Sequence, residues 1–164
     1  MPRPSPARPL RLGEWMGFYE TWSEGRPKIP AGSYDLKCLK AEKRSIWHEG
    51  QNAWGKTERV VVWFQIFEGE FAGTIIPMFL TIGAGGRVPQ GSKYYIGWTI
   101  ANGLFRPKRG RLKEMALSKF EGKLFRGDVV DVRPKWKGGP EMQSVFHYSR
   151  VDVIRELIAG NPDA

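Results

Sequence analysis

The chain has 164 residues, 41 % of them hydrophobic, which is enough for the core of one globular domain and excludes a disordered composition. Lys and Arg number 26 against 17 Asp and Glu, and the formal net charge of +9 favours polyanionic partners, although a basic surface can also serve only solubility. The single cysteine, Cys38, excludes an intrachain disulfide and a thiolate metal cluster, and no run of 18 apolar residues could span a membrane. The N-terminus lacks the apolar segment of a secretory signal, so we expect a cytoplasmic protein without membrane contact.

Residues 1–28 are rich in proline and arginine and are predicted to form a partly helical N-terminal arm. Four aromatic residues at roughly helical spacing, Trp15, Phe18, Tyr19 and Trp22, predict one short amphipathic helix that packs onto the body of the protein. An arm that contacts partners is the alternative.

Three strands are predicted next, over residues 33–40, 58–67 and 74–82. The second is the strongest, because Val60, Val62, Phe64 and Ile66 alternate with a face that carries Arg59, Val61, Trp63 and Gln65. The polar segment 45–57 is predicted to be a hairpin loop with two aromatics on it, and a glycine turn joins the second and third strands. The three strands therefore form an antiparallel meander.

A helix is predicted over residues 92–102, with Ser92 as its N-cap and Gly103 as its stop. A basic connector, 104–111, leads to a second short helix over 112–120. The fourth strand is expected at 123–133 and the fifth at 141–151, with a glycine turn at 135–139 between them and a helical turn or two over 151–159.

This order of elements predicts a mainly β protein, a five-stranded OB-fold-like barrel with a helical insertion between strands 3 and 4. Other small barrels and sandwiches also have five strands. Residues 29–160 are predicted to form this single domain, which follows the N-terminal arm.

The positive charge is confined to one part of the chain. Residues 87–138 hold thirteen basic and four acidic groups, whereas residues 31–86 hold six of each. Five of the cations fall within eight residues, and their mutual repulsion is unfavourable unless phosphates or counter-ions lie over them. Aromatic rings interleaved with Lys and Arg are what a single strand requires, since a ring stacks on an unpaired base while a cation holds the adjacent phosphate. A solvated basic loop is the alternative.

The candidate nucleic-acid-binding residues are Lys37, Trp47, Trp54, Arg59, Trp63, Arg106, Lys108, Arg109, Arg111, Lys113, Lys135, Trp136 and Lys137. Trp47 and Trp54 flank a hairpin loop of the kind that closes over ligands in OB-folds. For Trp63, stacking on a base and burial under the N-terminal arm are equally open. Trp136, in a glycine turn, could stack on a base or fold back onto the barrel.

Two segments resemble a known family. "IPAGSYDLKCLKAEK" with "VVVWFQIFEGEFAGTIIPMFLTI", and later "SKFEGKLFRGDV", are similar to the OB-fold single-stranded-DNA-binding proteins of phages and mobile elements. The likeness covers residues 29–82 and 118–133, and its motifs are mostly those of turns and strands. It implies non-sequence-specific binding of single-stranded DNA, in preference to RNA, as an accessory to replication or recombination. The N-terminal arm, the long first hairpin and residues 92–111 depart from the family pattern.

Catalysis has little support in the sequence. His48 and His147 have no metal-ligand or triad spacing, and Gly83 to Gly86 lack the lysine of a phosphate loop. We therefore expect neither an enzyme nor a metal or other cofactor. A protein-interaction or adaptor barrel of a nucleoprotein complex, with incidental RNA or duplex contacts, is the alternative function. Contacts with replication or recombination proteins and homo-oligomerisation are left open.

Overall fold

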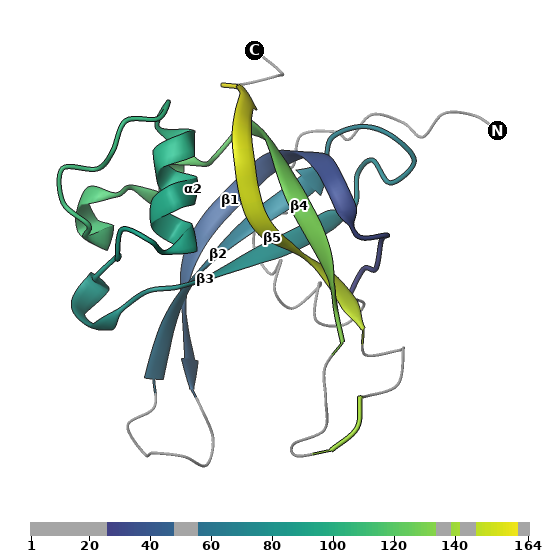
Figure 1. Ribbon diagram of the computed structural model, residues 1–164, viewed down its shortest axis with the longest axis horizontal. Coiled ribbons are helices and arrows are strands. Elements are labelled where there is room, and N and C mark those ends of the chain that lie inside the picture. Colours follow the sequence, from purple (N-terminus) through teal and green to yellow (C-terminus); the bar gives the residue numbers. More distant parts are fainter. Residues whose placement is uncertain (1–25, 48–55, 134–138, 142–146, 161–164) are drawn as a thin grey trace, which may run out of the picture.

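The computed structural model describes residues 26–47, 56–133, 139–141 and 147–160 (Figure 1). Several predictions lie outside these residues: the arm up to residue 25, the loop with Trp54, and the turn with Lys135, Trp136 and Lys137. The side chain of Trp47, at the end of the first strand, also lies outside the described part.

Five strands form one antiparallel sheet in the order β3-β2-β1-β4-β5. The strands are β1 (Gly32–Trp47), β2 (Lys56–Ile66), β3 (Ile75–Thr81), β4 (Leu124–Val132) and β5 (Tyr148–Ala159). The sheet curves strongly, but it is not closed into a barrel, because its edge strands β3 and β5 do not pair with each other (Figure 1). The mainly β prediction with five strands is confirmed, whereas the predicted closure is not observed.

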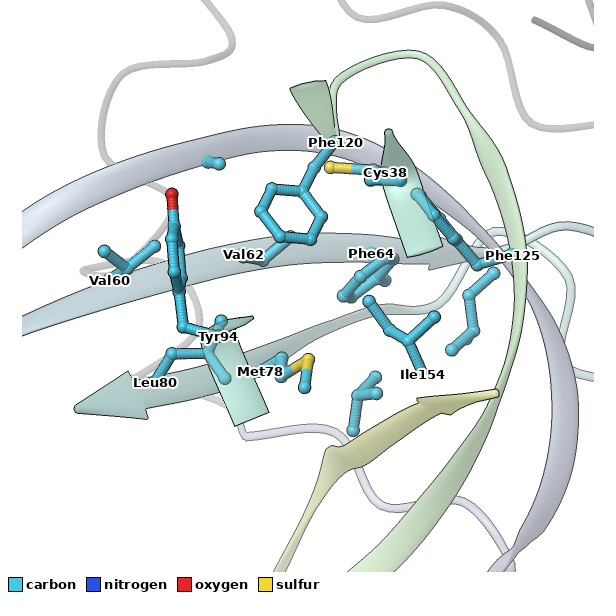
Figure 2. Packing of buried hydrophobic residues seen from close by; sticks show 14 of the residues in the cluster. Cys38, Val60, Val62, Phe64, Met78, Leu80, Tyr94, Phe120, Phe125 and Ile154 are labelled. Carbon is cyan, nitrogen blue, oxygen red and sulfur yellow. The ribbon is translucent and has the colours of Figure 1, made fainter. Parts of the chain in front are cut away.

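The core lies on the concave side of the sheet and follows the alternation expected from the sequence. Val60, Val62, Phe64 and Ile66 of β2 are all fully buried. Figure 2 shows Phe64, Phe125 and Phe120 close together, with ring centroids 6.1 Å apart for the first pair and 6.3 Å for the second. Edge-to-face and tilted packing of this kind lets the rings fill the space between sheet and insertion.

The structure differs from the sequence prediction at β5, since residues 151–159 are strand and not helical turns. Val151 and Ile154 are buried three residues apart, which is a helical spacing. Their partners on β4, Val129 and Gly127, are only two residues apart, because bulges shift the register between the strands. The extra residue turns a strand period of two into an apparent period of three.

The helical insertion between β3 and β4 is confirmed. Helix α2 (Lys93–Ala101) begins after Ser92, whose hydroxyl accepts a hydrogen bond from the Tyr95 amide. It follows η2 (Ala84–Gly86) and packs on the concave side of the sheet through Tyr94, Trp98 and Ala101.

The predicted second helix over 112–120 is wrong. The chain there forms two 3₁₀ turns, η3 (Leu112–Glu114) and η4 (Leu117–Lys119). Met115 and Phe120 are both fully buried, and side chains five residues apart do not share one face of an α-helix. The break between the turns allows both to enter the core.

Candidate functional site

Side chains of α2 anchor the segment that follows it. The Tyr94 hydroxyl donates to the Met115 carbonyl at 2.8 Å, and the Trp98 indole donates to the Ala116 carbonyl at 3.1 Å. Lys123 donates to the Ala101 carbonyl at the end of the helix. The first two bonds use carbonyls that a continuous helix over 112–120 would have required. Together the three bonds fix the path of residues 103–119 beside α2.

The connector also pairs with the segment before α2. The Val88 amide donates to the Gly110 carbonyl at 2.8 Å, and Arg87 and Arg111 form an isolated antiparallel bridge. Only glycine fits at position 110, because a Cβ there would collide with the Val88 carbonyl oxygen. Two arginines separated by 23 residues in sequence are thereby held side by side.

Residues 87–119 form a basic surface, which we call the insertion surface. The segment carries eight basic residues and one acid, Glu114. All eight are exposed: Arg87, Lys93, Arg106, Lys108, Arg109, Arg111, Lys113 and Lys119. Lys93 pairs with Asp152 of β5. Within the described chain, the other seven form no ion pair with a carboxylate.

The charges on the sheet are arranged differently. Six basic side chains on its strands and their flanks lie within 4.0 Å of a carboxylate oxygen: Lys28, Lys40, Arg44, Arg126, Arg133 and Arg155. Carboxylates therefore neutralise these six cations of the sheet and its flanks, whereas seven cations of the insertion surface have no such partner in the described chain. Such a surface concentrates anions from solution.

A groove lies within the insertion surface, beside α2. Its volume is about 520 Å³, within the range of small-ligand pockets. Trp98, Pro107 and Ala116 contribute apolar lining, and Arg106, Lys108 and Lys119 contribute cations. Asn102 and Glu114 complete the lining.

The end of α2 presents two apolar side chains to solvent. Leu104 is 76 % exposed and Phe105 is 74 % exposed, immediately before the cations of the connector. Leu104 has φ 70°, and it is the one non-glycine residue with positive φ in the described part of the chain. Its amide donates to the Thr99 carbonyl at 2.9 Å, and the Asn102 side-chain amide donates to the Phe105 carbonyl at 3.1 Å.

The structure separates the candidate residues into two groups. Arg106, Lys108, Arg109, Arg111 and Lys113 belong to the insertion, which packs on the concave side of the sheet. Lys37, Arg59 and Trp63 alternate with core residues of β1 and β2, so they face the convex side. The two groups do not form one continuous site.

Trp63 offers no ring face to a base, because its side chain is fully buried. With Leu39 and Val61 it forms a second hydrophobic cluster on the convex side, against which Ile75, Phe79 and Tyr148 pack. Its indole donates to Glu42 at 3.1 Å. The expectation that Trp63 stacks on a ligand is therefore not supported, since this side of β2 is itself covered.

Lys37 and Arg59, the other two candidate residues on the convex side, are partly buried. Burial lowers the pKa of Lys37, while Arg59 lies opposite Arg44 of β1 and Thr81 of β3. The Arg59 Nε is buried without a hydrogen-bond partner among the described residues. Neither residue belongs to the uncompensated charge of the insertion surface.

Four exposed residues of this surface are not among the candidates from the sequence: Arg87, Lys93, Phe105 and Lys119. Phe105 directly precedes the cation cluster, so its position in the chain was a usable signal. Arg87 and Lys119 lie outside that cluster, and only the pairing of Arg87 with Arg111 and the lining of the groove associate them with it.

No protein-family model, curated protein or solved structure matches this chain. In the described part of the chain, no cluster of three or more His, Cys, Asp or Glu could hold a metal ion. No helix there has the length and apolar character needed to cross a membrane.

Proposed function

We propose that this protein binds single-stranded nucleic acid, with DNA favoured over RNA, through the insertion surface. One observation carries the proposal: seven exposed cations gather there without carboxylate partners in the described chain, whereas six cations of the sheet and its flanks each pair with a carboxylate. Phosphates supply the missing counter-charge, and the release of condensed ions favours binding.

A single strand is favoured over a duplex because exposed apolar side chains lie beside these cations. Leu104 and Phe105 offer surface that pairs with the faces of unstacked bases, and a duplex hides those faces. The resemblance of residues 29–82 and 118–133 to phage and mobile-element single-stranded-DNA-binding proteins supports the same ligand. A role accessory to replication or recombination follows from that resemblance.

We also propose that the sheet is a partly open OB-fold. Its five strands have a helix between the third and the fourth, and Cα atoms of β3 and β5 approach within 8 Å without forming a ladder. OB-folds are five-stranded Greek-key barrels that are partly open. In this proposal the ligand binds to the insertion between β3 and β4, which is unusual for an OB-fold. The loops at the ends of β1 and β4 can contribute to the same binding.

A titration with labelled single-stranded dT30 and the matching duplex, followed by anisotropy at several salt concentrations, tests the proposal. We expect tighter binding of dT30, and we expect Arg109→Ala to reduce the slope of log affinity against log salt by about 0.7, the value for one single-strand phosphate contact. Arg155→Ala removes the same charge from a residue paired with Asp128 and is expected to leave the slope unchanged.

Failure to bind dT30, or equal effects of the two substitutions, would show that the insertion surface is not the binding site. Weak, equal and steeply salt-dependent binding to both nucleic acids would instead identify a general polyanion patch. In that case the adaptor function, with nucleic-acid contacts incidental, becomes the better description.

A further inference from the structure

Phe105 differs from the other aromatic residues that the structure describes. Tyr94, Trp98, Phe120 and Phe125 are buried in the core, whereas Phe105 is 74 % exposed. An exposed ring is unfavourable in water, since burying such a side chain contributes about 1.5–3 kcal/mol. The fold nevertheless holds this residue outside the core.

The turn that presents Phe105 is ordered by several hydrogen bonds. Gly103 donates to the Ile100 carbonyl, Leu104 to that of Thr99, and the Asn102 side chain to that of Phe105 itself. Leu104 adopts φ 70°, a left-handed conformation that costs a non-glycine residue about 1–2 kcal/mol. An observed strained residue is a reason to suspect function, because such conformations cluster at ligand sites.

The surroundings of Phe105 suit a nucleotide strand. Arg106 follows it directly, and Arg106, Lys108 and Lys119 line the groove beside α2 together with the apolar Trp98, Pro107 and Ala116. Single-strand sites combine rings that stack on bases with a positively charged groove that follows the phosphates. The groove supplies these cations, and its one acid, Glu114, leaves them in excess.

We propose that Phe105 is a base-stacking platform for single-stranded DNA and that the cations of the groove hold the neighbouring phosphates. This inference rests on the proposed function and assigns its aromatic contact. An apolar tip beside cations could also insert into an anionic membrane. Nucleic acid is favoured because the cations line a concave groove next to the tip, whereas a membrane surface needs no groove.

The test compares dT30 with a strand of 30 abasic sites, which has the same backbone charge but no bases. The wild-type protein is expected to prefer dT30. Phe105→Ala is expected to weaken dT30 binding by about 5- to 150-fold, the range for loss of one stacked base, and to leave abasic binding unchanged. Phe105→Tyr keeps the ring and should retain the preference. Ile158→Ala, at another exposed apolar side chain, is the matched control.

Lys119→Ala is expected to weaken binding of both strands alike and to reduce the salt slope, because it removes a phosphate contact and no stacking. If dT30 is bound but Phe105→Ala matches wild type on both strands, the platform is wrong and the proposed function stands. If Lys119→Ala changes neither strand, the role of the groove is wrong. Absence of dT30 binding defeats the proposed function itself.

A second experiment measures binding to vesicles of phosphatidylcholine with phosphatidylserine, which tests the membrane alternative. Under the proposal, Phe105→Ala changes dT30 binding whether or not the protein associates with vesicles. A loss of vesicle binding in Phe105→Ala, with dT30 binding intact, would overturn the inference in favour of a membrane contact.

Discussion

Glu42 illustrates how single residues neutralise charge on the convex side of the sheet. Burial by itself raises the pKa of this carboxyl, but hydrogen bonds from Arg44 and Trp63 and the charges of Arg44 and Lys40 outweigh it, so the pKa lies below its usual value. The Arg44 Nε lies 2.8 Å from the carboxylate, and the Trp63 indole nitrogen lies 3.1 Å from it. One carboxylate thus satisfies the polar atom of a buried tryptophan and two cations.

The lowered pKa predicts a dependence of stability on pH. The ionised Glu42 stabilises the folded state above its unfolded pKa, and this contribution is lost as pH falls through the folded pKa. Glu42→Gln should therefore be less stable than wild type at pH 7, and the difference should shrink from about pH 5 downward. Urea unfolding across this range measures it. Glu68→Gln, at an exposed carboxylate, is the control, and a difference independent of pH would contradict the assignment.

At the scale of elements, the pairing of residues 87–88 with 110–111 determines the shape of the insertion surface. The approach depends on Gly110, since a side chain there would meet the Val88 carbonyl. Helix α2, which lies between these two segments in the chain, is fixed independently by its cap Ser92 and by its hydrogen bonds to Met115 and Ala116. The position of the cations can therefore be disturbed without removing any of them.

Gly110→Ala should separate the two segments and break the bond between Val88 and Gly110. We expect a loss of about 1–3 kcal/mol in the free energy of unfolding, typical of overpacking, together with weaker binding of dT30. Gly91→Ala is the matched control, because a Cβ at position 91 meets nothing within 4 Å. Chemical denaturation and anisotropy check both effects. Wild-type behaviour of Gly110→Ala in both assays would show that this close approach has no importance.

At the scale of the whole molecule, charge is segregated between sheet and insertion. The excess in residues 87–138 equals the entire formal net charge of +9, and residues 103–119 hold six of its cations and one acid. Figure 1 shows this segment beside α2. Repulsion among unpaired cations destabilises the folded state, so an anion that binds there should stabilise it.

Tripolyphosphate is predicted to raise the melting temperature of the protein when ionic strength is held constant. A ligand at 100 times its Kd stabilises the folded state by about 2.7 kcal/mol, provided that it does not bind the unfolded chain. The double variant Arg109→Ala with Lys113→Ala should lose most of this increase, whereas Arg155→Ala should retain it. Differential scanning fluorimetry decides the matter, and an equal increase in all three proteins would place the anion elsewhere.

The sequence predicted the parts of the fold that have local causes. Alternation at Val60, Val62, Phe64 and Ile66 identified β2 because the side-chain period of a strand is two. Ser92 and Gly103 predicted the limits of α2 because caps satisfy the free backbone groups at helix ends. The cluster from Arg106 to Lys113 was visible because its members are adjacent in the chain.

Only the tertiary structure decided what depends on distant segments. Bulges against β4 shift the phase of β5, and a cluster with Leu39 and Val61 buries Trp63, so local periodicity predicted neither correctly. The open edges between β3 and β5 and the pairing of Arg87 with Arg111 likewise depend on contacts far apart in the chain. The sequence by itself determined that five strands surround a helical insertion and where the charge lies, because alternation, caps and charge clusters are local features. The tertiary structure decided which side chains remain exposed to use that charge, because burial is set by the neighbours that folding brings together.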